Sequence, residues 1–525
     1  MASDWPPTLS PEHEQALLAL ASDYSLSHGL VLRPLPSPAD HAISQTSAIH
    51  APYSLFPSPF PARLFQQARD LQPLYNQLYA AITANDQFLE EVVGGAVAKV
   101  DEFQGRLYDI WKTVKQEGIR QPISLGLFRS DYLIHAPSEN KDTWELKQVE
   151  FNTISSSFGA LSTRVGEMHR YLLSSGLYPS HPSLTPPSLP QNGALAGLAA
   201  GLAAAHRAYG KDDAVVLMVI QDNERNAFDQ RLIEWEVVAK HGIRLLRVPF
   251  SQLRTTLSLA PSSSDSTSPA PHSLLYTPPH PFPSSSPSAA TPTPVEVSLV
   301  YYRTAYSPTD YYTPAEWATR LLIERSRAIK CPSVAMQLAG AKKVQQVLSL
   351  PHQLERCVPG AAAAERAQLR ESFTGLWPMD DSDEGREGQR RARDECEGYV
   401  LKPQREGGGN NIYRGDIPPF LDALAAQDEQ KVEGEPKGRE GYILMSLIEP
   451  PQGMEQVLVK GGEAQGRRAD VVSELGVYGV VLVDEEQGTV IRNETVGHLL
   501  RTKGRESDEG GVAVGFSVID SPWLI

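Results

Sequence analysis

The segment from Gly398 to Asn411 restricts the possible folds of this chain more than any other stretch. Gly398-Tyr399-Val400-Leu401 predicts a short buried strand, which leads into Lys402-Pro403-Gln404-Arg405-Glu406-Gly407-Gly408-Gly409-Asn410-Asn411. Consecutive glycines let a backbone approach a ligand closely, and their N–H groups can line a concavity that binds anions. Lys402 can meet a phosphate, and Glu406 can hold the magnesium that accompanies nucleotide phosphates. A surface turn is the alternative, but a cation, a carboxylate and two amides around the glycines favour nucleotide binding.

Composition excludes several classes of partner. The chain has 525 residues, which predicts two or three domains. Its formal charge of −15 argues against nonspecific nucleic-acid binding, which needs a basic surface. Three cysteines without a CxxC motif indicate a reduced intracellular compartment. The N-terminus lacks the pattern of a signal peptide, and no stretch approaches the roughly 20 apolar residues of a membrane-spanning helix. We therefore expect a cytoplasmic protein without nucleic-acid or membrane partners.

Periodicity predicts a mixed α/β chain. Helices are expected from residue 8 to about 120 and, rich in Ala, Gly and Leu and closely packed, over 193–208. Strands are expected over 144–152, 214–220 and 295–302, the second of them covered on both faces. In the first strand, Val149 and Phe151 should share one face, with Glu150 and Asn152 on the other. Thr313-Pro314-Ala315-Glu316 predicts a capped helix start.

Four segments have the composition of surface loops inserted between these elements. Residues 178–192 and 255–294 are rich in Pro and Ser, and residues 379–397 and 426–440 are charged. Such compositions bury too little apolar surface to fold alone. A linker between two separate proteins is the alternative for 255–294, but the strand–loop–strand pattern around it favours an insertion into one domain.

Several polar clusters follow the predicted strands. Glu150 and Asn152 place two oxygen ligands on one strand face, a spacing that suits magnesium, and hydroxyl groups follow in Thr153-Ile154-Ser155-Ser156-Ser157. Glu224-Arg225-Asn226-Ala227-Phe228-Asp229-Gln230 comes after the buried strand 214–220, where ligand groups concentrate. The alternatives are a polar strand face for the first cluster and a solvated helix start for the second.

Cations complete the pattern. Arg129 and Arg303 are candidates for binding carboxylates in bidentate fashion, with a structural ion pair as the alternative for each. Arg501-Thr502-Lys503 sets two cations on one face, and Glu509-Gly510-Gly511-Val512-Ala513 predicts a second turn of small residues. Together these clusters describe a site for phosphates, carboxylates and magnesium. Two functions fit: an ATP-dependent carboxylate–amine ligase and a regulatory nucleotide-binding module. The dispersed cations exceed what nucleotide binding alone needs, which favours the ligase.

The order of these motifs resembles eukaryotic glutathione synthetases, which are ATP-grasp ligases. The resemblance covers the chain except the four insertions, and it rests on these segments: Phe128-Arg129-Ser130-Asp131-Tyr132, residues 148–155, Glu224-Arg225-Asn226 with residues 228–231, residues 337–340 and 342–346, residues 402–413, Ser473-Glu474-Leu475-Gly476, and residues 497–503.

The resemblance implies an ATP-grasp fold and a ligase that joins γ-glutamylcysteine and glycine through an acyl phosphate, as a cytosolic homodimer. It implies magnesium at Glu150, Asn152 and Glu406. The implied ATP-binding residues are Glu150, Lys342, Lys402, Glu406, Gly407, Gly408, Gly409, Asn410, Asn411, Tyr413, Met445, Ile448, Glu474, Lys503 and Glu509. The implied substrate-binding residues are Arg129, Ile154, Ser155, Ser156, Ser157, Glu224, Arg225, Asn226, Gln230, Arg303, Tyr306, Arg501, Val512 and Ala513. Arg129, Ser157, Lys402 and Arg501 are the implied catalytic residues.

The chain departs from the family pattern twice. Ser446-Leu447 follows Met445 where the family usually has Glu-Lys, and Arg303-Thr304-Ala305-Tyr306 replaces Arg-Asp-Gly-Tyr. A ligase that uses β-alanine or serine in place of glycine is an alternative within the family. We expect three parts: residues 1–212 with the helical N-terminal region and the start of the ATP-grasp body, a substrate-binding α/β domain over 213–341 that contains the insertion 255–294, and a nucleotide-binding part over 342–525 with glycine-rich lid loops.

Overall fold

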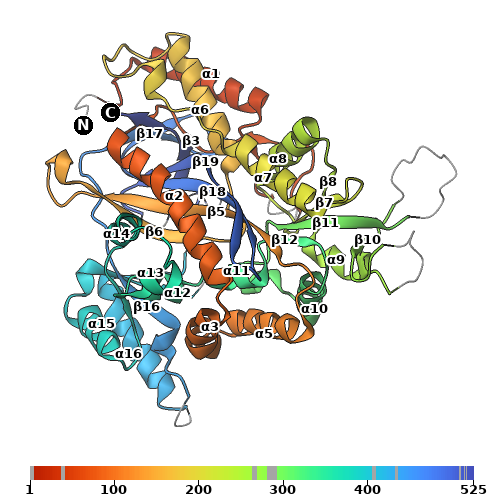
Figure 1. Ribbon diagram of the computed structural model, residues 1–525. Coiled ribbons are helices and arrows are strands. Elements are labelled where there is room, and N and C mark those ends of the chain that lie inside the picture. Colours follow the sequence, from red (N-terminus) through yellow and green to blue (C-terminus); the bar gives the residue numbers. More distant parts are fainter. Residues whose placement is uncertain are drawn as a thin grey trace.

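The computed structural model describes residues 5–36, 42–262, 269–280, 292–404, 409–431, 435–507, 510–512, 515 and 517–525. A large mixed sheet runs through the centre, helices pack on both of its faces, and a smaller sheet lies below it (Figure 1). The chain is therefore a mixed α/β protein, as its sequence predicts. In the described part of the chain, no helix has both the length and the apolar character needed to cross a bilayer.

The centre of the main sheet brings distant segments of the chain together. The long strands β18 (Gly466–Asp484) and β19 (Thr489–Gly504) pair antiparallel, and β18 also pairs with β5 (Ile123–His135). β6 (Glu145–Asn152) pairs with the carboxyl-terminal half of β5. In this register Glu474 lies opposite Arg501, and Asp131 lies opposite Glu150. The sheet thus places four charged residues from four strands in adjacent positions.

A parallel section extends the sheet from the other half of β5. β12 (Ile329–Cys331), β11 (Val295–Tyr302), β7 (Val215–Ile220) and β8 (Leu245–Pro249) follow one another in that order. Every residue of β7 is buried, which confirms the strand predicted as covered on both faces. Because β7 and β11 are neighbours, the polar segment after β7 and Arg303 after β11 emerge at the same edge.

Alternating apolar residues bury both faces of the main sheet. Val477 and Val481 of β18 pack in the core under helix α2 (Ala62–Thr83), whereas Val480 and Leu482 pack in the core under α6 (Gly159–Ser174) and α7 (Ala194–Tyr209). The close packing expected of α7 is confirmed at Gly197, where an added Cβ would lie 2.3 Å from the Cβ of Val496.

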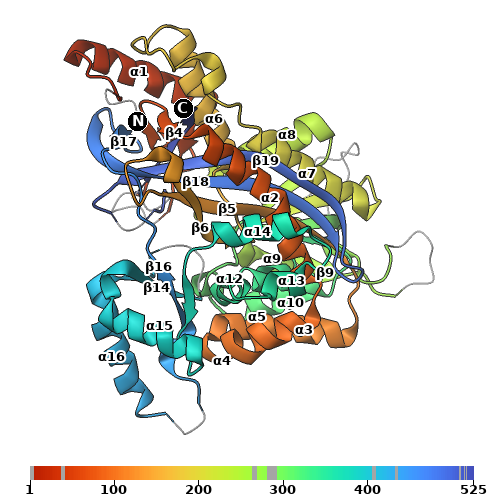
Figure 2. The ribbon, with the colours of Figure 1, turned by 60° about the vertical axis from the view of Figure 1, so that its left-hand side comes forward.

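The smaller sheet has a core of its own. It consists of β13 (Leu376–Pro378), β16 (Tyr442–Ser446), β14 (Tyr399–Pro403) and β15 (Ile412–Tyr413), with helices α15 (Asp383–Asp394) and α16 (Ile417–Asp428) packed against it. Figure 2 shows this unit projecting below the main sheet. The strand predicted over 398–401 is confirmed as the start of β14.

The prediction of a loop over residues 379–397 is wrong, because α15 occupies most of it. Ser382 caps this helix by accepting a hydrogen bond from the N–H of Gly385, and the acidic first turn suits the positive end of the helix dipole. Glu387 pairs with Arg390 and Arg391 at the i,i+3 and i,i+4 spacings. The charge content therefore marks an exposed helix with local ion pairs.

Other boundaries also differ from the sequence prediction. Residues 8–120 are mostly helical, in α1 (Pro11–His28), α2, α3 (Asp86–Leu89) and α5 (Glu102–Glu117), but the short strands β1 (Val31–Leu32), β2 (Ile49–His50), β3 (Tyr53–Ser54) and β4 (Ser58–Phe60) interrupt them. Segment 255–294 is a loop only in part, since β9 (Leu257–Leu259) and β10 (Leu274–Tyr276) extend the main sheet beside β11. The capped start predicted at Thr313 is confirmed for α10 (Pro314–Glu324).

Strand β6 contains a bulge that overturns its predicted alternation. Asp131 pairs with Glu150, and the next residue, Tyr132, pairs with Gln148, so Val149 is the extra residue. Gln148 and Phe151, three positions apart, are both buried, whereas Val149 and Glu150 both line a cavity. Val149 and Phe151 therefore do not share a face, because one unpaired residue shifts the side-chain period of the strand.

Candidate functional site

A cavity of about 660 Å³ lies where the carboxyl end of β6, the strands β18 and β19 and the smaller sheet meet. It is lined by residues from segments that are far apart in the sequence. The lining includes these predicted site residues: Arg129, Glu150, Asn152, Ile154, Ser155, Ser156, Ser157, Tyr306, Lys342, Lys402, Asn410, Asn411, Tyr413, Met445, Ile448, Glu474, Arg501, Lys503 and Val512. Gly510 and Gly511 of the second glycine turn also line it.

Asp131 organises the cationic side of this cavity. Its carboxylate is fully buried and accepts hydrogen bonds from Nε and Nη2 of Arg129 at 2.6 and 2.8 Å. Nη2 of Arg501 donates to the same carboxylate at 3.0 Å, and Nδ2 of Asn152 at 2.9 Å. Two arginines from β5 and β19 are thus oriented by one buried counter-charge. Arg129 therefore forms the structural ion pair that was the alternative to carboxylate binding, and the same side chain also lines the cavity.

Glu150 and two lysines form the second charged group. Nζ of Lys342, in the first turn of α12 (Lys342–Leu348), lies 2.7 Å from Oε2 of Glu150. Nζ of Lys402, on β14, donates to the carbonyl oxygen of Val149 at 3.1 Å. Burial alone would raise the pKa of Glu150, but the positive charges of Lys342 and Lys402 hold it well below its usual range. Glu150 is therefore an ionised carboxylate within the cavity.

Glu474 faces Arg501 and has the opposite tendency. Burial raises the pKa of Glu474, and the negative charges of Asp131 and Glu150 add to that rise, while Arg501 opposes it. Nη2 of Arg501 contacts Glu474 and Asp131 together. The cavity therefore holds cations and carboxylates in close mutual contact.

The loop from Thr153 to Phe158 carries the hydroxyl groups. Ser155 and Phe158 have φ of 54° and 71°, a conformation that non-glycine residues rarely adopt and that clusters at functional sites. Oγ of Ser155 donates to the carbonyl oxygens of Tyr302 and Thr304, and the hydroxyl of Tyr478 donates to the carbonyl oxygen of Ser157 at 2.6 Å. The loop is thus tied to β11 and β18 on either side.

Arg303 lies directly behind this loop. Its Nη2 donates to Oγ of Ser157 at 3.0 Å and to Asp229 at 2.9 Å. Asp229 also accepts from the N–H groups of Phe158 and Ala160, so it caps α6. Nε and Nη1 of Arg303 are buried and without a hydrogen-bond partner among the described residues. Such donors indicate room for an acceptor that a ligand would supply.

Four of the predicted substrate-binding residues form a separate polar group that does not line the cavity: Glu224, Arg225, Asn226 and Gln230. Glu224 accepts hydrogen bonds from the N–H of Asn226 and from Nε2 of Gln230, at 2.6 and 2.7 Å. Arg225 turns away and donates to the carbonyl oxygen of Arg33. The cavity lining thus contains none of these four residues, nor Arg303. Of the five, Arg303 alone contacts a lining residue, which is Ser157.

The glycine-rich stretch 407–409 is described by the structure only at Gly409. This glycine has φ of 77° and does not line the cavity. The predictions for Glu406, Gly407, Gly408, Glu509 and Ala513 lie outside the described residues.

The end of β16 and the residues after it contribute Met445, Ser446, Leu447 and Ile448 to the lining. The N–H groups of Ser446 and Leu447 donate to the carbonyl oxygens of Gly375 and Gly398, which fixes this segment against its neighbours.

Sequence reasoning missed three residues that hold the site in place: Asp131, Asp229 and Tyr478. Asp131 and Asp229 lie inside motifs named above, and for Asp131 the available signal was a carboxylate two positions from Arg129 on one strand face. Tyr478 sits in an ordinary apolar strand pattern, and nothing in the sequence distinguishes it. The contribution of these residues arises from strand pairing and helix packing.

A mixed α/β fold that gathers arginines, lysines and carboxylates around a deep cavity defines an enzyme that handles a polyanionic substrate. Comparison with known proteins makes this specific. The family model described as eukaryotic glutathione synthase, ATP binding domain, matches residues 11–524. The glutathione synthetases of Mus musculus and Homo sapiens are each 38% identical, over 527 and 526 residues, with the whole of both chains covered. The chloroplastic glutathione synthetase of Arabidopsis thaliana is 36% identical over 98% of this chain and 86% of the plant protein.

A solved structure shows the same fold. A glutathione synthetase-like effector from Globodera pallida in its apo form superimposes with a TM-score of 0.72, at 23% identity, over 99% of this chain and 98% of the effector. The chain belongs to the eukaryotic glutathione synthase family. It is accordingly an enzyme of glutathione synthesis, in the class of ATP-dependent ligases.

Proposed function

We propose that this protein joins γ-glutamylcysteine to glycine in two steps. The cysteinyl carboxylate attacks the γ-phosphorus of ATP, the bond from that phosphorus to the bridging oxygen breaks, and ADP leaves. The amine of glycine then attacks the acyl phosphate, loses a proton, and displaces phosphate to give glutathione. The observation that carries the proposal is the convergence of Arg129, Lys342, Lys402 and Arg501 around Glu150 in one cavity.

The chain itself supplies positioning and charge. No enzyme nucleophile is required, because ATP makes the carboxylate electrophilic, so the rate depends on alignment and on neutralising negative charge. Lys342 and Lys402 stand next to Glu150 and suit the phosphates, while Arg129 and Arg501 share Asp131 and suit the reacting carboxylate. Seven further residues that the sequence predicts to bind ATP line the same cavity: Asn410, Asn411, Tyr413, Met445, Ile448, Glu474 and Lys503.

The described residues fit a magnesium ion. Glu150 is ionised, and Asn152 donates through Nδ2 to the protein, which leaves its amide oxygen for a ligand. Carboxylate and amide oxygens together with phosphate oxygens suit this ion, and Glu406 would complete the protein's share. When bound, magnesium neutralises charge on the transferred phosphoryl group. Among the described residues, this cavity included, no group of three or more carboxylate, imidazole or thiol side chains is placed to hold a metal by itself, so phosphate oxygens would have to supply further ligands.

The dipeptide would extend from Arg129 and the loop Ile154–Ser157 toward Arg303, Glu224, Asn226, Gln230 and Tyr306. Support comes from Nε and Nη1 of Arg303, which are buried without a partner among the described residues, and from the contact of Arg303 with Ser157. The glycine carboxylate would meet Arg501 beside Val512, which is buried at the cavity wall. Glycine-rich turns at 407–409 and 510–511 would act as lids that exclude water from the acyl phosphate.

We also propose that the fold is of the ATP-grasp type, with a substrate-binding domain over 213–341. Family membership and the parallel section of the sheet support this assignment. A homodimer is expected from the same family, and light scattering should give twice the mass of one chain. A cytoplasmic location is expected because the three cysteines are free thiols. Fractionation of cells tests it.

The deciding experiment measures ADP release by the purified protein with γ-glutamylcysteine, glycine, ATP and magnesium. We expect release only when all four are present, and glutathione should form in equal amount. A protein that binds ATP but releases no ADP would be a sensor and would overturn the proposal. Competition among glycine, β-alanine and serine in one reaction separates the glycine-specific ligase from its alternatives.

The variant Lys402→Met tests the site itself. Loss of a charge next to the phosphates should lower turnover at least tenfold, the effect of about 1.4 kcal/mol in the barrier. Lys460→Met, an exposed lysine after β17 (Glu455–Val459), is the matched control and should keep full activity. Equal activity of both variants would contradict the role of Lys402.

A further inference from the structure

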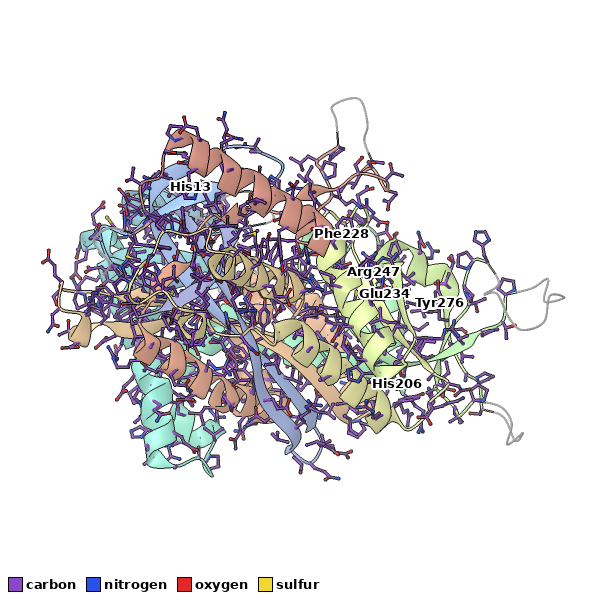
Figure 3. The ribbon with its side chains drawn as sticks, turned by 90° about the horizontal axis from the view of Figure 1, so that it is seen from above. His13, His206, Phe228, Glu234, Arg247 and Tyr276 are labelled. Carbon is purple, nitrogen blue, oxygen red and sulfur yellow. The ribbon has the colours of Figure 1, made fainter. Side chains whose placement is uncertain are left out.

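Arg247 contacts the polar group of Glu224, Asn226 and Gln230 through the side chain of Gln230. Its Nε and Nη2 both donate to Oε1 of Gln230, at 3.1 and 2.6 Å. Gln230 in turn donates through Nε2 to Oε2 of Glu224 at 2.7 Å. Figure 3 labels Arg247 close to helix α8 (Ala227–His241), between Phe228 and Glu234 of that helix. A chain of hydrogen bonds thus connects β8, α8 and the segment after β7.

The chemistry of the three groups allows only one orientation of the amide. A guanidinium has donors only, and an ionised carboxylate has acceptors only. The Gln230 oxygen must therefore face Arg247, and its NH2 group must face Glu224. Gln230 is fully buried, so water does not compete for this arrangement. Without Arg247, the amide oxygen of Gln230 would lose both of its donors, and Glu224 alone would hold the side chain.

Arg247 is an unusual choice for a purely structural arginine. Among the described residues its hydrogen bonds go to a neutral amide, that of Gln230. Burial lowers the pKa of Arg247 to about 10, and the positive charge of Arg231 adds to that decrease. An apolar side chain would fill this position at less cost in desolvation. The arginine is therefore explained by its contact with Gln230 and not by its contribution to stability.

We propose that Arg247 is a positioning residue for recognition of the dipeptide: it orients the Gln230 amide, which holds the Glu224 carboxylate ready for the α-amino group of the γ-glutamyl moiety. The inference rests on the proposed function. It assigns the amino end to the Glu224–Gln230 pair, because a carboxylate attracts an ammonium group. It assigns the α-carboxylate to Arg303, whose buried Nε and Nη1 lack acceptors among the described residues.

The test compares KM values for the three substrates in Arg247→Met and wild type. We expect the KM for γ-glutamylcysteine to rise roughly tenfold, the effect of losing one charge-assisted hydrogen bond, while the KM values for ATP and glycine stay the same. N-glutarylcysteine, which lacks the α-amino group, should be affected much less. Arg247→Lys should recover part of the loss, because one donor to Gln230 remains.

Two further variants separate positioning from general damage. Arg254→Met removes an exposed arginine of the nearby helix α9 (Phe250–Thr256) and should match the wild type. The double variant Arg247→Met with Gln230→Leu should be no worse than Gln230→Leu alone, because Arg247 acts through Gln230.

Clear results would overturn the inference. An unchanged KM for the dipeptide in Arg247→Met, equal losses for all three substrates, or a full additional loss in the double variant would each do so. If Arg247→Met does not fold, as judged by its melting temperature, Arg247→Gln is judged by the same criteria. A wild-type protein without turnover would instead refute the proposed function, so the two failures are distinguishable.

Discussion

Replacing Asp131 by Asn should damage this protein more than any other single charge removal near the cavity. The carboxylate is fully buried and accepts hydrogen bonds from Arg129, Arg501 and Asn152. An asparagine of the same shape has one acceptor oxygen and no charge, so both buried guanidinium groups lose their shared counter-charge. Removing one partner of a buried ion pair costs about 3–5 kcal/mol, and Asp131 serves two such pairs.

The assay is thermal unfolding of Asp131→Asn next to Asp142→Asn, a control at an exposed aspartate of the hairpin that follows β5. The control should change the free energy of unfolding by less than about 0.5 kcal/mol, as exposed substitutions do. Pyrophosphate should raise the melting temperature of Asp131→Asn more than that of wild type, because an anion can replace part of the lost charge. Equal melting temperatures for the two variants would refute the reasoning.

Three other predictions follow from the structure. Lys342→Met removes the partner 2.7 Å from Glu150 and should raise the KM for ATP at least tenfold without changing that for glycine, as initial rates would show. Burial raises the pKa of Asp520 from 3.8 to about 6, so the folded state holds a proton that the unfolded chain releases. The contribution of Asp520 to stability therefore falls as pH rises from about 4 to 6, and Asp520→Asn should gain up to about 3 kcal/mol relative to wild type between pH 4 and 7 in paired melts. Gly197→Leu forces a side chain into Val496 and should cost at least 1–3 kcal/mol in unfolding experiments; a melting temperature like that of wild type would contradict the packing described for α7.

Much of the architecture was accessible from the sequence because local signals agreed with it. The apolar run of β7 is buried at every position, and the box at Thr313 caps α10 as its residues require. Several of the cations and carboxylates that interrupt apolar patterns, among them Arg129, Glu150 and Arg501, line one cavity, since buried polar residues are costly unless they have a partner or a ligand. These parts depend on contacts within a few residues or on the direction of a strand.

What escaped prediction depends on pairing between distant segments. The role of Asp131 requires β19 to bring Arg501 alongside β5, and no spacing within one motif encodes that neighbour. Arg247 is recognisable only once α8 has packed beside β8 and presented Gln230 to it. The helix α15 was mistaken for a loop because its few buried residues are Gly385, Gly388 and Ala392, which give no apolar periodicity.

The irregularity of β6 has a practical consequence for engineering. A stabilised redesign would impose strict alternation of apolar and polar residues on this strand. Such a sequence would remove the doubled step at Val149, and with it the carbonyl acceptor of Lys402 beside the carboxylate of Glu150. Because Gln148 and Phe151 are three positions apart, a regular strand could not bury both, so the redesign would disturb the core as well as the cavity. Improvement of this strand by general rules would thus yield a more regular protein with no activity.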